Sequence, residues 1–179
     1  MKKTVLLLVL ALGINFNIKA QEIPKLNLTK TGIEGIIVPV DSTPSNELYS
    51  NGLNWVQETY KNPSEVLKAN IENTKIRVNG YSSDSWYIKT LGMKQYFDLS
   101  YSIEITFKDD KYKLEYTITE LSDNGKRFGY SYSSFFKKDG SVRKMYTGAV
   151  EDINNQMNSL SNSFYEYVSG KTEEKNSDW

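Results

Sequence analysis

The chain has 179 residues with no cysteine and no histidine, and its 22 basic side chains balance 22 acidic ones. A disulfide framework and a thiol-linked lipid anchor are therefore excluded, and the commonest metal ligand and general base is missing. The length fits one domain that can bury a sound core, and the charge balance gives no electrostatic reason to bind nucleic acid.

Residues 1–20 have the three parts of a secretory signal peptide. Lys2 and Lys3 form the positive start, an apolar run covers residues 5–14, and Ala20 precedes the expected cleavage site. The run is shorter than the ~20 residues that a bilayer requires, so we expect no integral membrane segment after cleavage. Cleavage would leave 19 basic and 22 acidic side chains. We therefore expect an exported, mildly acidic protein in the periplasm or the medium.

The rest of the chain predicts a single domain. Residues 21–32 are polar and irregular, and we expect a flexible lead-in there. One α+β domain then spans residues 33–170. The polar residues 171–179 predict a disordered tail.

Strand and helix signals follow one another in the first half of this domain. A β-rich run at residues 34–40 predicts a strand, and Thr43 with Pro44 is typical of a helix start, with Thr43 as the capping residue. Positions spaced by three and four predict one helix face made of Leu48, Gly52, Trp55, Val56 and Thr59. Residues 66–71 and 74–81 predict a hairpin, and residues 82–94 predict a loop whose apolar side chains cover the core.

The clearest strand signal covers residues 98–119. Apolar and polar residues alternate from Asp98 to Phe107 and again from Tyr112 to Thr119, which predicts an antiparallel hairpin with one wet face. A second turn is predicted at Asn124 and Gly125. Beyond it, Phe128, Tyr130 and Tyr132 predict a short strand or an ordered loop.

Helical spacing returns from Val142 to Val168, and Gly170 is placed to end that helix in a left-handed conformation. The element order is β-α-β-β-β-β-α. Antiparallel neighbours with helices on one side predict an α+β two-layer sandwich, in which two helices cover one face of a sheet of four to six strands.

A family resemblance rests on the residues from Asn46 to Tyr60, NELYSNGLNWVQETY, followed by residues 66–80 and the hairpin at residues 103–120. Together they resemble the exported bacterial domain-of-unknown-function family numbered 4468, which is described as having a TBP-like fold. The resemblance implies the same element order and adds no catalytic motif. Architecture shared with the TATA-box reader does not carry DNA binding, so we expect no nucleic-acid partner.

Short motifs of penicillin-recognising serine enzymes also occur. They are Lys30-Thr31-Gly32, Ser122-Asp123-Asn124, and the Ser-x-x-Lys pairs Ser134 with Lys137 and Ser141 with Lys144. A lysine one helical turn after a serine can activate its hydroxyl. Serine and lysine are so frequent here that about two such pairs are expected by chance, and the motifs run in reverse order. A serine hydrolase is a remote alternative, and we expect no catalytic residues.

Tyrosines concentrate around the predicted sheet, at positions Tyr96, Tyr101, Tyr112, Tyr116, Tyr130 and Tyr132. Half-buried packing is the usual role of such residues, and Trp55 on the helix is expected in the core. The alternative is an aromatic-lined groove for a sugar, a peptide or an apolar ligand. Its candidate ligand-binding residues are Trp86, Tyr87, Tyr130 and Tyr132, with Trp86 and Tyr87 as a lid.

The leading hypothesis is therefore a non-enzymatic, exported binding or envelope-associated module with an unknown protein or small-molecule partner. The alternative is a small-molecule carrier with a cavity between the sheet and the C-terminal helix. The acidic pairs Asp109 with Asp110 and Glu151 with Asp152 are explained by a turn and a helix start. We thus expect no metal site and no cofactor.

Overall fold

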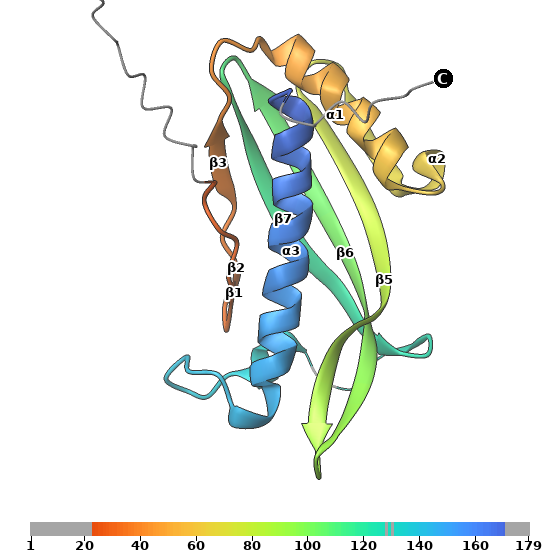
Figure 1. Ribbon diagram of the computed structural model, residues 1–179, viewed down its shortest axis with the longest axis vertical. Helices are drawn as coiled ribbons and strands as arrows, with labels where there is room; N and C mark the ends of the chain where they lie inside the picture. Colours follow the sequence, from red (N-terminus) through yellow and green to blue (C-terminus); the bar gives the residue numbers. More distant parts are fainter. Residues whose placement is uncertain (1–22, 128, 130, 171–179) are drawn as a thin grey trace, which may run out of the picture.

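The computed structural model describes residues 23–127, 129 and 131–170. An antiparallel sheet forms one layer, and the helices α1 (Ser45–Thr59) and α3 (Thr147–Val168) lie over one of its faces (Figure 1). The predicted α+β two-layer sandwich and its element order are confirmed.

The sheet has six strands, and five of them lie side by side in the order β3-β7-β6-β5-β4. Their bounds are β3 Ile36–Pro39, β4 Leu67–Ile71, β5 Lys75–Thr90, β6 Met93–Lys108 and β7 Lys111–Asp123, and β8 (Lys126–Arg127) pairs with β7. Because β3 and β4 are opposite edges, α1 and the single-turn α2 (Pro63–Val66) carry the chain across the sheet.

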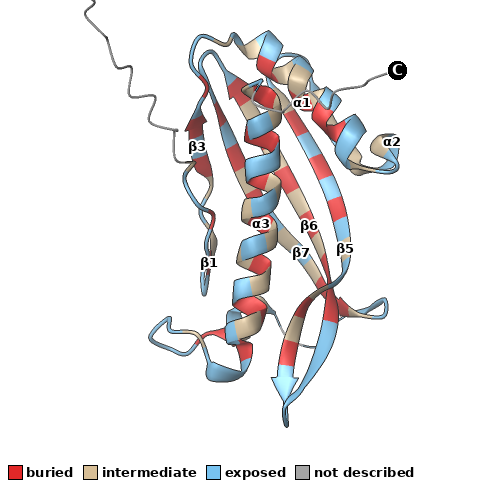
Figure 2. Ribbon diagram, viewed as in Figure 1, coloured by how far each residue is buried: buried red, intermediate tan, exposed pale blue. Residues whose placement is uncertain are grey.

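The central hairpin follows the predicted alternation. Ile103 pairs with Tyr116 and Ile105 with Leu114, and all four side chains are buried under the helices. Burial alternates along β5, β6 and β7 (Figure 2), as expected of strands with one covered face. The register of β6 and β7 thus follows from the hydrophobic pattern.

The start of α1 differs from the prediction. The helix begins at Ser45, and Thr43 makes no capping bond to it. Instead the Ser45 N–H donates to Asp109 Oδ1 at 2.9 Å, and the Thr43 N–H donates to Asp110 Oδ1 at 3.2 Å. The bonds from Ser45 lower the pKa of Asp109. The acidic turn between β6 and β7 therefore caps the helix from a distant part of the chain.

Helix α3 begins later than its sequence pattern predicts. Val142 forms an isolated bridge with Phe136, and a short 3₁₀ helix, η2 (Lys144–Tyr146), precedes Thr147. The C-terminus agrees with the prediction, since Gly170 has a φ of 67° just beyond the helix.

The expected lead-in is ordered from residue 23 onward, so that prediction is wrong for residues 23–32. β1 (Leu28–Thr29) and β2 (Gly32–Ile33) form a small hairpin, and Leu26 and Leu28 are buried. Asn158 of α3 accepts from the Leu26 N–H at 2.9 Å and donates to its carbonyl at 2.9 Å. Side chains of α3 thus supply the bonds that a neighbouring strand would give. The predicted signal peptide and tail lie outside the described residues.

The predicted loop at residues 82–94 is a second correction. β5 continues to Thr90 and β6 already begins at Met93, with a register shift between Ser82 and Trp86. At this bulge Asp84 has a φ of 49°, and its N–H donates to Asp98 Oδ1 at 3.1 Å. We call the paired residues 86–97 the ribbon and their outer part, residues 89–94, the ribbon tip.

Candidate functional site

Trp86, the first predicted ligand contact, is fully buried, and its indole N–H donates to the Asp98 carbonyl at 3.0 Å. Its ring stacks on Phe97 with centroids 4.6 Å apart and lies 5.4 Å from the ring of Phe135, which in turn stacks on Tyr146 at 4.6 Å. The prediction that Trp86 forms part of a lid over a ligand is wrong. These four rings fasten the base of the ribbon to the segment before α3.

Tyr87 is half-buried on the other side of the ribbon from this aromatic stack. Its ring lies so close to Gly148 that a Cβ there would stand 2.5 Å from the ring. On the paired strand, the centroid of the Tyr96 ring lies 5.8 Å from that of Tyr87, and the Lys94 ammonium lies 3.9 Å from the centroid of the Tyr87 ring. Tyr87 therefore joins the ribbon to the first turn of α3.

Tyr132 lies elsewhere, at the start of the 3₁₀ helix η1 (Tyr132–Phe135), and Tyr130 is outside the described residues. Tyr132 lines a hollow of about 470 Å³ together with Ile118, Glu120 and Arg127. Neither Trp86 nor Tyr87 is among the residues that line this hollow. The structure thus does not bring the predicted aromatic set together as one groove.

The tyrosines of the central strands belong to the core. Tyr101, Tyr112 and Tyr116 are all buried, and Tyr101 stacks on Tyr116 at 5.1 Å. Phe164 of α3 packs edge-on against Tyr112 at 4.9 Å and against Trp55 at 5.2 Å. Aromatic rings therefore fill the space between sheet and α3 in which the carrier hypothesis requires a cavity.

Replacing Tyr112 with phenylalanine should leave the free energy of unfolding unchanged or raise it by about 1 kcal/mol. The Tyr112 hydroxyl is buried, burial raises its pKa, and no hydrogen-bond partner is found for it among the described residues. Urea denaturation tests this, with Tyr167→Phe as the control that removes a 2.7 Å bond to Glu58. A loss above 1 kcal/mol at Tyr112 would reveal a bonded internal water instead.

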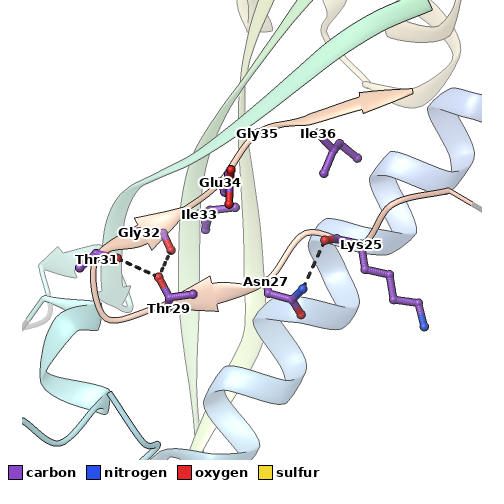
Figure 3. A pocket seen from close by; sticks show the side chains of 9 residues that line it. All are labelled: Lys25, Asn27, Thr29, Thr31, Gly32, Ile33, Glu34, Gly35 and Ile36. Carbon is purple, nitrogen blue, oxygen red and sulfur yellow. Dashed lines mark hydrogen bonds between the residues drawn. The ribbon is translucent and has the colours of Figure 1, made fainter. Parts of the chain in front are cut away.

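A hollow of about 620 Å³ lies beside the N-terminal hairpin (Figure 3). It is lined by Lys25, Asn27, Thr29, Thr31, Gly32, Ile33, Glu34, Gly35 and Ile36. Two of its polar side chains are bonded locally, since Thr29 Oγ1 donates to the Gly32 carbonyl at 2.6 Å and Asn27 donates to the Lys25 carbonyl at 3.3 Å. These bonds stabilise the hairpin rather than present a convergent set of groups to a ligand.

The serine and lysine motifs are not assembled into a site. Ser141 Oγ donates to Asp139 Oδ1 at 2.7 Å, and Ser134 Oγ donates to the Ser131 carbonyl at 2.8 Å. Ser122 is buried within β7, whereas Lys30 lies at the hairpin turn, where its ammonium donates to the Lys138 carbonyl. In neither Ser-x-x-Lys pair does the described geometry direct the lysine at the serine.

The ribbon tip carries the most exposed apolar side chains of the described chain. Leu91 is 94% exposed and Met93 is 72% exposed. Thr90 pairs with Met93 across a two-residue turn in which Leu91 and Gly92 have φ angles of 50° and 85°. Lys89 and Lys94 pair directly behind it. Residues 82–94 have the composition of a loop, and Leu91 stands where a hairpin turn usually has asparagine, so Gly92 is the sole sign of this turn in the sequence.

A comparison of family models identifies the domain. The model described as a domain of unknown function (DUF4468) with TBP-like fold matches residues 36–122, from the start of β3 almost to the end of β7. The chain carries a DUF4468 domain. The match confirms the resemblance found in the sequence. The matched residues include the whole ribbon, and α3 lies after them in the chain.

Two solved structures share the fold of this DUF4468 protein. One is a TBP-like protein from Parabacteroides distasonis ATCC 8503, with 14% identity, a TM-score of 0.50, and 75% of this chain and 92% of that chain covered. The other is a DUF4468 family protein from Bacteroides ovatus ATCC 8483, with 12% identity, a TM-score of 0.52, and 83% and 88% covered. At these identities the likeness shows the fold alone. No curated protein matches the chain.

Within residues 23–127, 129 and 131–170, no group of three or more acidic side chains is arranged to hold a metal ion. None of the helices in those residues is long and apolar enough to span a membrane.

Proposed function

We propose that this protein is an exported, non-enzymatic binding module associated with the cell envelope, and that the ribbon tip docks onto its partner. The leader-like residues 1–20 support export. The observation that carries the docking role is Leu91, a large apolar side chain that is almost fully exposed on a left-handed backbone.

A leucine is unfavourable at position 91, in the two-residue turn between β5 and β6. A two-residue turn with positive φ at both positions favours Asn-Gly, and a bulky side chain there is strained. The chain builds the same turn between β7 and β8 with Asn124 and Gly125, whose φ angles are 48° and 76°. The other non-glycine residues that have positive φ in the described chain are all serine, asparagine or aspartate. Neither local conformation nor solvation explains Leu91, so a contact made outside the monomer is the best explanation.

The base of the ribbon supports the same role. The four packed rings of Trp86, Phe97, Phe135 and Tyr146, together with the packing of Tyr87 on Gly148, hold the ribbon against the body of the protein. A docking element that is already rigid loses little conformational entropy when it binds. The ribbon thus presents an apolar tip on a fixed support.

The test separates folding from docking through Leu91→Asn. Asparagine suits the turn, so this variant should melt at the same or a higher temperature, with a gain on the order of 1 kcal/mol. The full chain is expressed in a bacterial host, the exported form is recovered, and its sedimentation with cell envelopes is measured. Wild type should sediment with the envelopes and Leu91→Asn should not. Ile71→Asn, which removes a 54% exposed apolar side chain on β4, is the matched control and should behave as wild type.

Three results would contradict the proposal. An intact mass that retains residues 1–20, in protein confined to the cytoplasm, would contradict export. Equal sedimentation of wild type and Leu91→Asn would contradict docking through the ribbon tip. A non-enzymatic role would be contradicted if the protein turned over a substrate in a broad hydrolase panel, or was labelled by a fluorescent penicillin, and a single substitution abolished that activity.

A further inference from the structure

We infer that the surface onto which the ribbon tip docks is an anionic lipid bilayer, with Leu91 and Met93 entering its apolar boundary and Lys89 and Lys94 contacting lipid phosphates. This inference rests on the proposed docking role of the ribbon tip. It adds the chemical class of the partner.

The two lysines supply the charge argument. Lys89 and Lys94 are directly paired across the two strands, and both are exposed. Like charges at directly opposed positions destabilise a strand pair. The Tyr87 ring under the Lys94 ammonium offsets part of this cost. A negatively charged surface would remove the repulsion, so the pair favours an anionic partner.

Neighbouring residues extend the same combination of charge and apolar surface. The short helix η2, which packs against β5 at this end of the molecule (Figure 1), carries Lys144 and the half-exposed Met145, and Arg143 precedes it. The acidic groups at this end are Glu151 and Asp152 at the start of α3, and Asp123 at the end of β7, which accepts a hydrogen bond from Gln95 of the ribbon at 3.4 Å. Burial raises the pKa of Asp152, while its attraction to Lys94 opposes that rise. Basic side chains therefore outnumber acidic ones here, in a protein with no overall positive charge.

The shape of the ribbon tip favours a bilayer over a protein partner. A stable protein interface buries roughly 1,200–2,000 Å² in total, from about 20–30 residues on each side. The ribbon tip is the narrow end of two strands that projects past α3 (Figure 1), and it offers only residues 89–94. Insertion of a few apolar side chains beside basic ones is sufficient for reversible binding to a charged membrane.

Co-sedimentation with vesicles tests the inference. Vesicles of phosphatidylcholine alone are compared with vesicles that also contain phosphatidylglycerol. Wild type should sediment with the anionic vesicles only, and added salt should weaken binding. Leu91→Asn should lower the partition coefficient about tenfold. Each of Lys89→Gln and Lys94→Gln should lower it about fivefold. Lys68→Gln, at an exposed position on β4, is the matched control and should have no such effect.

The result that overturns the lipid assignment is distinct from failure of the proposed function. The wild type could fail to bind anionic vesicles and still sediment with envelopes in a manner that depends on Leu91. If protease treatment of the envelopes then abolishes sedimentation, the partner is a protein. Equal binding to both kinds of vesicle, or binding that Lys89→Gln and Lys94→Gln leave unchanged, also overturns the assignment. Loss of Leu91 dependence in both assays removes the docking role itself.

Discussion

Replacing Trp86 with alanine should lower the free energy of unfolding by about 3–5 kcal/mol, the largest loss that we expect from any single truncation in the ribbon. The side chain is fully buried, stacks on Phe97, lies against Phe135 and donates a hydrogen bond to the Asp98 carbonyl. Its removal would leave a cavity at the junction of the ribbon and the segment before α3. Urea denaturation measures the loss.

Two controls define the origin of this effect. Trp86→Phe keeps an aromatic ring in the stack but removes the indole N–H, so it should cost less than Trp86→Ala. Asn79→Ala removes an exposed side chain on the same strand and should change stability by no more than about 0.5 kcal/mol. A loss below about 1 kcal/mol for Trp86→Ala would mean that the aromatic stack does not hold the ribbon.

The second prediction concerns Gly80, where alanine should destabilise the protein by about 1–3 kcal/mol. A Cβ at this position on β5 would lie 2.2 Å from the Tyr101 ring, far inside van der Waals contact. Tyr101 cannot easily move away, because its ring stacks on Tyr116 and its hydroxyl lies 3.4 Å from the Tyr60 hydroxyl. The cost therefore arises from overpacking.

A double-mutant cycle separates this clash from the propensity of alanine for a strand. Tyr101→Ala removes the ring, so Gly80→Ala should cost less in the Tyr101→Ala background than in the wild type. Gly129→Ala is the control, since a Cβ there meets nothing within 4 Å. Additive losses for the two substitutions would contradict a direct clash between Gly80 and Tyr101.

Regular patterns made the layers of this fold predictable. From Tyr101 to Phe107 the alternation agrees with the register of the central strands, because a slip by one residue would expose the whole apolar set; before Tyr101 a bulge between Ser100 and Tyr101 shifts the pairing. The spacing of three and four also predicted the buried face of α1, except that Thr59, at the end of the helix, is exposed. The predicted helix cap at Thr43 was wrong, because the bonds at the helix start come from Asp109 and Asp110, more than sixty residues later in the chain.

The ribbon was missed because its bulge interrupts the period of two. Residues between Ser82 and Trp86 have no partners on β6, so polar positions accumulate and the segment has the composition of a loop. A loop at this place predicts an exposed Trp86, and it predicts no hairpin turn at the ribbon tip. The start of α3 was misplaced because Val142 and Met145 fit helical spacing by coincidence, while the chain there forms a bridge and a 3₁₀ turn.

The bonds between Asn158 and Leu26 set an order for the assembly of this molecule. The first described residues are tied to the last helix, so in a chain that emerges from its N-terminus they cannot reach their places until α3 has followed them. Until then Leu26 lacks the Asn158 bonds that hold it in the folded protein. Closure of this N-terminal segment therefore depends on α3, the last helix of the chain to be made.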